Sequence, residues 1–295
     1  MLHHLTTESV NPASAEIDSL SALEIVRLIN AEDAGVAAAV GQEAEPIAAA
    51  IELITEALRQ GGRLVYIGAG TSGRLGVLDA SECPPTFNSE PWQVVGVIAG
   101  GPTALTSAIE GAEDSPEQGV EDLRKLQFSS RDVLVGIATS GRTPYVIGAL
   151  RYAQQIGAPA IGLTCNAASE LASVSDVVIA PVVGPEVING STRMKAGTAT
   201  KMVLNMLTTG AMVRLGKTYG NYMVDLRSTN TKLVARAKRI VARLTELEEA
   251  EAERLLGDCD GEVKTAIVMH RRQVDAEQAR ALLAEAGGHL RRVIG

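Results

Sequence analysis

The chain has 295 residues and a formal net charge of −8 at pH 7. Hydrophobic residues make up 46% of it but aromatic residues only 3%, so a core must be built mostly from Ala, Val, Leu and Ile. The negative charge argues against nucleic acid or an anionic membrane surface as the main partner. An anionic small ligand is still compatible with this charge, because local N–H groups and hydroxyls can bind it.

The sequence also predicts the cellular compartment and whether a metal site is present. Its three cysteines, Cys83, Cys165 and Cys259, are far apart, so no disulfide framework is expected and a reducing cytoplasm fits. The N-terminus lacks a basic and an apolar region, so we expect no signal peptide, and no run of 18 apolar residues predicts a membrane span. The four histidines show no metal-ligand spacing, so no metal site is predicted.

The predicted elements begin with an arm over residues 1–15, followed by helices. Ser21 and Glu24 form a capping box, and a helical pattern over about 32–60 ends at two glycines. Five short, nearly all-apolar runs follow, as is typical of strands buried on both faces: 64–67, 94–98, 133–138, 160–163 and 177–180. Most are separated by helical patterns: 73–81, 115–126, 143–156 and about 168–174. This alternation predicts βαβ units and a parallel sheet.

The last third of the chain is predicted to be helical. A long helix ends near residue 215, a basic helical stretch covers 230–244, and 245–295 contain three short helical patterns after a capping box at Thr245 and Glu248. We therefore predict an α/β protein with a doubly wound five-stranded parallel sheet, N-terminal helices and a small C-terminal helical module. The expected division is 1–60, 61–225 and 226–295, with ligands bound beyond the carboxyl ends of the strands.

The first candidate site follows the first predicted strand, where the chain reads Gly68-Ala-Gly-Thr-Ser-Gly73 (loop 1). Glycines let the backbone approach a ligand, and the helix start that follows offers N–H groups to a phosphate. A dinucleotide fingerprint would also need an acidic residue at the end of the second strand, but residues 97–101 contain none. Phosphate binding is therefore favoured over dinucleotide binding.

A second turn resembles the first and also follows an apolar strand: Thr139-Ser-Gly-Arg-Thr143 (loop 2). Two such turns in one sheet could direct their hydroxyls and N–H groups to a single phosphate. The alternative is that Ser140 and Thr143 only cap a helix, which these residue types do well. We favour a phosphate site, and its predicted residues are Gly70, Thr71, Ser72, Ser140, Gly141 and Thr143.

Two carboxylates and a cationic segment complete the candidates. Glu82 stands just before Pro84 and Pro85, a pair expected to stop the preceding helix. Glu113 precedes a predicted helix start, where it could serve acid–base chemistry or merely complement the helix dipole. The segment that contains Ser191, Arg193 and Lys195 brings cations to a helix N-terminus, which is unfavourable unless an anion is near, so we favour a substrate or subunit contact for it.

These motifs resemble a known family. Loops 1 and 2 resemble the phosphate loops of sugar isomerase (SIS) domains. The longer stretches resemble N-acetylmuramic acid 6-phosphate etherases over the whole chain: Gly68 through Phe87, Glu110-Gly-Ala-Glu-Asp114 and Gly190-Ser-Thr-Arg-Met-Lys-Ala-Gly-Thr198. The resemblance implies a flavodoxin-like SIS fold and a cofactor-free lyase of amino-sugar recycling. The implied products are N-acetylglucosamine 6-phosphate and D-lactate.

The resemblance also implies roles and partners. With the sugar ring open, the aldehyde at C1 acidifies the C2 proton, a carboxylate removes it, lactate leaves C3, and water adds. Glu82 would be the proton donor and Glu113 the second acid–base residue, with their shares in each half-reaction left open. A homodimer is implied, in which Arg193 or Lys195 reaches a neighbouring site.

Two rival hypotheses remain beside the etherase. One is an aldose–ketose phosphosugar isomerase, and another is a non-enzymatic phosphosugar sensor, because relatives of these etherases include the glucokinase regulatory protein. A DNA-binding SIS regulator is disfavoured, because no basic helix-turn-helix precedes the sheet and the net charge is −8.

Overall fold

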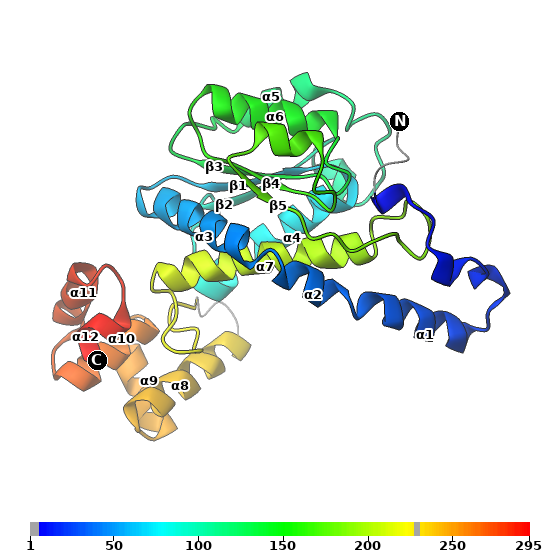
Figure 1. The fold of residues 1–295 in the computed structure, drawn as a ribbon. Coiled ribbons are helices and arrows are strands. Elements are labelled where there is room, and N and C mark those ends of the chain that lie inside the picture. The colour runs from blue at the N-terminus through cyan, green and yellow to red at the C-terminus, as the bar shows by residue number, and fades with distance from the viewer. Residues whose placement is uncertain (1–5, 227–230) are drawn as a thin grey trace. The chain divides into compact units, whose positions relative to one another are not determined.

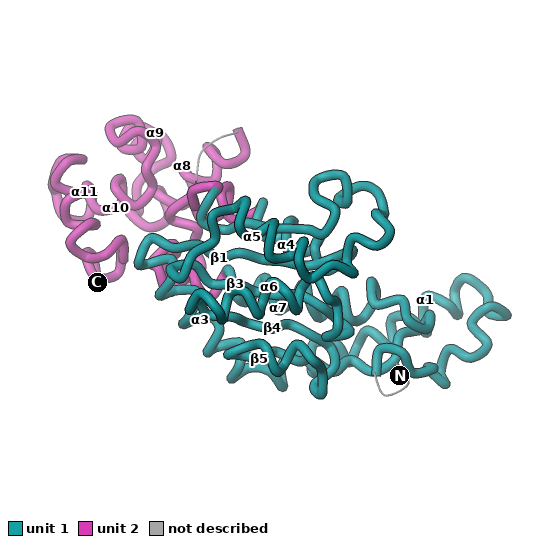
Figure 2. Tube along the Cα trace, turned by 90° about the horizontal axis from the view of Figure 1, so that it is seen from above, with its two compact units in different colours: residues 1–81, 92–208 teal, residues 82–91, 209–295 magenta. Residues whose placement is uncertain are grey.

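The structure is a computed structural model that describes residues 6–226 and 231–295. Its contacts divide the chain into two compact units (Figure 2). Unit 1 comprises residues 1–81 and 92–208, and unit 2 comprises residues 82–91 and 209–295.

Unit 1 is built on a five-stranded parallel sheet with the order β2-β1-β3-β4-β5. The predicted strands are confirmed, and their ends differ from the prediction by no more than one residue: β1 Leu64–Gly68, β2 Val94–Ile98, β3 Val133–Ile137, β4 Ala160–Leu163 and β5 Val177–Ile179. Every residue of β1, β3 and β4 is buried, which explains why these strands are almost entirely apolar.

Helices cover both faces of the sheet, as the doubly wound prediction requires (Figure 1). One face is covered by α5 (Pro116–Lys125) and α6 (Pro144–Gln155), and the other by α3 (Ala44–Arg59) and the unit 1 parts of α4 (Gly70–Phe87) and α7 (Lys195–Arg214). Buried Asp79 of α4 ties this second layer together. It accepts hydrogen bonds from the Tyr66 hydroxyl of β1 at 2.9 Å and from Asn205 Nδ2 of α7 at 2.6 Å.

The N-terminal part of unit 1 comprises three short 3-10 turns, at Thr6–Glu8, Pro12–Ser14 and Ile17–Ser19, then α1 (Ala22–Asp33) and α2 (Val36–Gly41). The capping box of Ser21 and Glu24 is confirmed at the start of α1. The long helical pattern that was predicted over 32–60 is interrupted twice, at residues 34–35 between α1 and α2 and at residues 42–43 between α2 and α3. No residue of α1 is buried in this chain.

Two predictions about helices were wrong. The prolines at 84 and 85 do not stop the helix, because α4 continues through them to Phe87. Proline keeps a helical φ and mainly costs hydrogen bonds to the preceding turn, and both prolines stand in the last turn of α4, which ends two residues after Pro85. The helix ends at Asn88, which has φ 49° and donates its N–H to the Pro84 carbonyl at 3.0 Å. The pattern at 168–174 forms only a 3-10 helix, Glu170–Val174.

Unit 2 is a helical module, as predicted. Its helices are α8 (Thr231–Thr245), α9 (Glu249–Gly257), α10 (Val263–Arg272), α11 (Ala276–Glu285) and α12 (Leu290–Ile294), so four helices rather than three follow residue 245. Residue 230, the predicted start of the basic helix, lies outside the described residues. The predicted capping box at Thr245 was wrong. Thr245 ends α8 with its hydroxyl bonded to the Val241 carbonyl, and Glu248 and Glu251 form the box instead.

Candidate functional site

Loop 1 leads from β1 directly into α4, which begins three residues earlier than predicted. Gly70 has φ +53°, and Thr71 and Ser72 lie in the first helical turn, whose N–H groups have no partner within the helix. A Cβ at Gly68 would lie 2.8 Å from the Gly73 nitrogen, and one at Gly73 would lie 2.6 Å from the Gly68 oxygen. Backbone thus packs on backbone, and the turn presents N–H groups and hydroxyls suited to an anion.

Loop 1 lies beside the start of α7. A Cβ at Gly197 would lie 3.7 Å from Cγ2 of Thr71, which brings the first turns of α4 and α7 together. The segment that leads into α7 carries two predicted site residues, Ser191, which is half-buried, and Arg193, which is exposed. The structure therefore gathers one predicted phosphate residue and the predicted cationic segment in the same part of unit 1.

The N-terminus of α7 is capped by Glu186, a buried residue that the sequence analysis missed. Its two carboxylate oxygens accept hydrogen bonds from the backbone nitrogens of Lys195 at 3.0 Å and Ala196 at 2.9 Å. The Lys195 ammonium, also buried, pairs with Glu32 at 2.6 Å, and this hydrogen bond lowers the Glu32 pKa. The anions that the cationic segment required are thus supplied by the chain itself, and Lys195 would have to leave Glu32 to reach a substrate.

Loop 2 ends at Thr143, the N-cap residue of α6, whose side chain makes no capping hydrogen bond. The Ser140 hydroxyl accepts a hydrogen bond from the Arg142 nitrogen at 3.3 Å. Gly141 has φ +69°, and a Cβ there would lie 2.2 Å from Cβ of Ser169. The helix-cap interpretation that competed with phosphate binding is therefore weakened for Thr143, because its hydroxyl does not cap the helix.

Glu113 lies alongside loop 2. Its carbonyl accepts a hydrogen bond from the Tyr145 nitrogen in the first turn of α6 at 3.1 Å, and its side chain is exposed. Arg74 of α4 donates to the carbonyls of Leu105 at 3.1 Å and Ser107 at 3.3 Å, on the segment that leads towards Glu113. Arg74 thereby links the helix after loop 1 to the segment before Glu113, a link that no local pattern predicted.

Glu82, the other predicted carboxylate, is an exposed residue of α4 that belongs to unit 2. Its neighbour Cys83 is buried, in keeping with a small apolar packing role rather than a nucleophilic one. Cys165 of unit 1 is also buried. Burial and the Glu186 carboxylate raise its pKa to about 12, so it remains a neutral thiol.

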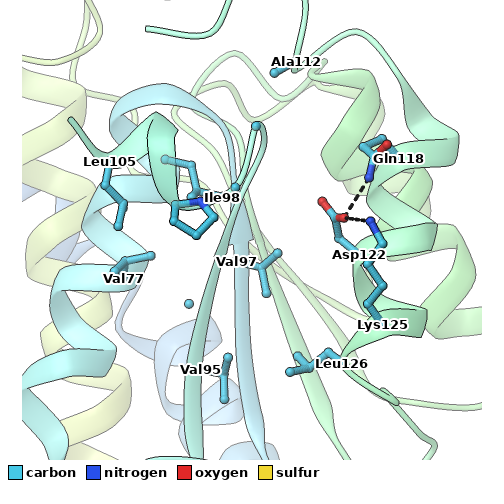
Figure 3. Close-up of a pocket in the computed structure, with 14 residues that line it drawn as sticks. Val77, Val95, Val97, Ile98, Leu105, Ala112, Gln118, Asp122, Lys125 and Leu126 are labelled. Atoms are coloured by element: carbon cyan, nitrogen blue, oxygen red, sulfur yellow. Dashed lines mark hydrogen bonds and ion pairs between the residues drawn. The ribbon is translucent and has the colours of Figure 1, made fainter. Parts of the chain in front are cut away.

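A pocket of about 780 Å³ lies elsewhere in unit 1, along the edge strand β2 between α4 and α5 (Figure 3). Its walls are mainly apolar, with Val77, Val95 and Val97 among them, and Asp122 accepts hydrogen bonds from two other lining side chains, Gln118 and Lys125. None of the predicted site residues lines it. The pocket chemistry does not suit a sugar phosphate, so loops 1 and 2 are the better candidate site.

Two further searches cover residues 6–226 and 231–295. Within these ranges, no three His, Cys, Asp or Glu side chains are gathered where they could hold a metal ion. Over the same described ranges, no helix combines the length and apolar character needed to cross a bilayer.

A five-stranded parallel sheet with two hydroxyl-rich strand-to-helix turns at its carboxyl edge is the arrangement expected of a SIS domain. Family models agree, since a SIS domain matches residues 117–210 and the glucokinase regulatory protein N-terminal SIS domain matches residues 46–154. The C-terminal lid domain of glucokinase regulatory protein matches residues 220–258. A phosphoheptose isomerase structure from Neisseria gonorrhoeae shares the fold, with 23% identity, a TM-score of 0.51, and coverage of 64% of this chain and 98% of that chain.

Full-length relatives specify the family within this class. An N-acetylmuramic acid 6-phosphate etherase of Rhodopirellula baltica is 64% identical, over 99% of this chain and 97% of its own length. Another of the same name, from Photorhabdus laumondii, is 56% identical with the same coverage. The chain belongs to the N-acetylmuramic acid 6-phosphate etherase family.

Proposed function

We propose that this protein is a carbon–oxygen lyase that cleaves the D-lactyl ether of N-acetylmuramic acid 6-phosphate. The products are N-acetylglucosamine 6-phosphate and D-lactate, in the recycling of cell-wall amino sugar. The single observation that carries this function is the 64% identity over the full length to a relative with that name. The fold alone would not identify the function, because SIS-type sheets host several activities.

Loops 1 and 2 bind the 6-phosphate in this proposal. The first turn of α4 offers unpaired N–H groups together with Thr71 and Ser72, and a helix N-terminus favours an anion. Loop 2 adds Ser140, Gly141 and the hydroxyl of Thr143, which makes no capping hydrogen bond to α6. Ser191 and Arg193 contact the substrate or a second subunit near Thr71. Lys195 instead remains in its ion pair with Glu32.

Glu82 and Glu113 carry the acid–base chemistry. In the open-chain sugar, a carboxylate removes the C2 proton, the electron pair forms a C2–C3 double bond, and lactate leaves C3 with a proton from the acid. Water then adds its oxygen to C3, and C2 is reprotonated. Glu82 acts as the proton donor and Glu113 as the second acid–base residue. No cofactor takes part in these steps.

The test is D-lactate release from N-acetylmuramic acid 6-phosphate, followed with a coupled dehydrogenase. We expect Glu82→Gln and Glu113→Gln each to lower kcat by about 10²- to 10⁴-fold, since each removes one proton-transfer group. Asp114→Asn, next to Glu113 and equally exposed, is the matched control and should keep normal turnover. Normal turnover in Glu82→Gln would contradict the mechanism.

One observation favours a second candidate, a phosphosugar sensor without turnover. This is the match of residues 220–258 to the lid domain of the glucokinase regulatory protein. A sensor would bind N-acetylglucosamine 6-phosphate but release no lactate, and binding would survive Glu82→Gln. An isomerase would instead convert an aldose phosphate to a ketose phosphate.

The assembly and the compartment are part of the same proposal. No residue of α1 is buried, and Leu23 and Val26 are 58% and 63% exposed, which supports a homodimer in which a second copy covers this helix. Light scattering should report a dimer for the wild-type protein. The double variant with Leu23→Ser and Val26→Ser should be monomeric, whereas the control variant Val10→Ser should remain a dimer. The three cysteines, all of them buried, fit a reducing cytoplasm. We assign substrate binding to residues 61–225, flanked by 1–60 and 226–295.

A further inference from the structure

The start of the described chain is bound to a loop about 160 residues away in sequence. Both the backbone nitrogen and the hydroxyl of Thr6 donate to Oδ1 of Asn166, at 2.9 and 2.8 Å. Asn166 in turn donates from Nδ2 to the Thr7 hydroxyl at 3.2 Å. Thr7 is 1% exposed and Asn166 is 5% exposed, so these hydrogen bonds are shielded from water.

The same Asn166 amide reaches loop 2. Its Nδ2 donates at 2.8 Å to the carbonyl of Thr139, the first residue of loop 2. That carbonyl also accepts hydrogen bonds from the Cys165 nitrogen at 2.9 Å and the Thr164 hydroxyl at 3.2 Å. Asn166 therefore joins two segments, the arm and loop 2, through one side chain that uses both its oxygen and its nitrogen.

The arm is attached a second time, near the segment that leads into α7. Asn11 donates from Nδ2 to Glu32 at 2.8 Å and to the Pro185 carbonyl at 3.3 Å, next to the residue that caps α7. A Cβ at Gly190 would lie 3.6 Å from the Glu8 carboxylate, on the segment that leads to α7. Residues 6–11 thus contact both the loop after β4 and the segment before α7.

We propose that Asn166 is a positioning residue, through which Thr6 and Thr7 hold loop 2 in the shape that binds the substrate phosphate. This inference rests on the proposed phosphate role of loop 2. A phosphate site binds tightly when its N–H groups are already oriented, so loss of the restraint weakens binding. The acid–base carboxylates are not part of this network, and the chemical step is therefore spared.

The experiment compares KM and kcat for D-lactate release. Asn166→Ala removes every hydrogen bond of the Asn166 side chain to the arm and to loop 2, and leaves the bond from the Thr6 hydroxyl to the Cys165 carbonyl at 3.3 Å. We expect KM to rise about tenfold with kcat changed less than about twofold. Thr6→Val with Thr7→Val removes only the hydroxyls, so KM should rise by a smaller factor. Thr6→Ser with Thr7→Ser restores the hydroxyls and should return KM to the wild-type value. Val10→Ala, on the same arm but 69% exposed, is the control.

Melting curves and calorimetric titration with N-acetylglucosamine 6-phosphate accompany the kinetics, so that the readout does not depend on turnover. Lower melting temperatures with unchanged KM and sugar-phosphate affinity would overturn the inference, because the arm would then be only structural. A fall in kcat at constant KM would overturn it as well. Ser140→Ala separates the two proposals. If it raises KM but Asn166→Ala does not, only the positioning role fails. If Ser140→Ala has no effect, the phosphate role of loop 2 fails.

Discussion

Loops 1 and 2 look alike in sequence but are held in different ways. Loop 1 is shaped by its own backbone, since Gly68 and Gly73 approach so closely that neither leaves space for a Cβ. Loop 2 is shaped by residues distant in sequence. Asn166 binds the Thr139 carbonyl, and the Leu171 nitrogen donates to the Gly141 carbonyl at 3.0 Å.

The difference means that one turn is specified locally and the other through the tertiary structure. A glycine-packed turn keeps its shape wherever the strand and helix are in place. A turn tied by side-chain hydrogen bonds depends on each partner, including Thr6 at the far end of the chain. Loop 2 should therefore respond to substitutions at distant positions and to the protonation of distant groups, whereas loop 1 should respond mainly to changes within itself.

The largest effect is expected for Gly73→Ala in loop 1. The new Cβ would lie 2.6 Å from the Gly68 oxygen and 2.6 Å from Cγ1 of Ile98, and the backbone oxygen has little room to move. We expect a loss of about 3 kcal/mol or more in the free energy of unfolding, measured by urea denaturation. Gly257→Ala, where nothing lies within 4 Å, is the control. Equal stability of the two variants would show that loop 1 is not backbone-packed.

Gly141→Ala in loop 2 should cost about 2–3 kcal/mol, from the positive φ and the contact with Ser169. Because the main clash is with a side chain, Ser169→Gly should recover part of the loss in the double variant. The remaining loss of about 1–2 kcal/mol reflects the left-handed φ. Urea denaturation of the two single variants and the double variant gives the coupling. Strictly additive losses would rule out this contact as the cause.

Acid should weaken the attachment of the arm as the pH falls below about 4.5. The Lys195 hydrogen bond lowers the Glu32 pKa from its ordinary value of 4.5. The stabilisation is therefore complete above about pH 4.5 and is lost as the pH falls through the lowered pKa. At pH 6, Glu32→Gln should be about 1–2 kcal/mol less stable than the wild type. The difference in stability between the wild type and Glu32→Gln should decrease in melting curves recorded from pH 6 to pH 3. A constant difference would contradict the stabilising role of the Glu32–Lys195 pair.

The smallest effect is expected for Thr143→Ala. Thr143 is an N-cap without a capping hydrogen bond, so its loss should change the unfolding free energy by no more than about 0.5 kcal/mol. Ser115→Ala is the matched comparison, because Ser115 accepts a hydrogen bond from the Gln118 nitrogen at 3.1 Å and should cost about 1 kcal/mol. Thr143→Ala should nevertheless raise KM. An unchanged KM would remove Thr143 from the proposed phosphate site.

Much of unit 1 was readable from the sequence because its signals are local. The five strands are apolar runs between turns, and the cap of α1 is a four-residue pattern, so neither depends on distant residues. The end of α4 did not follow from the local pattern, because the cost of its two prolines depends on where in the helix they stand. Glu186 was missed for a related reason, since it caps a helix that begins nine residues after it, at Lys195.

The sequence by itself determined the strands, the two hydroxyl-rich turns, and the motifs that place the chain in its family. Only the tertiary structure decided what holds those turns and charges. It paired Lys195 with Glu32 and joined Thr6 to Asn166 beside loop 2. The physical reason is that strand period and turn chemistry act between near neighbours in the chain. A buried hydrogen bond instead depends on which distant backbones the fold brings within 3 Å.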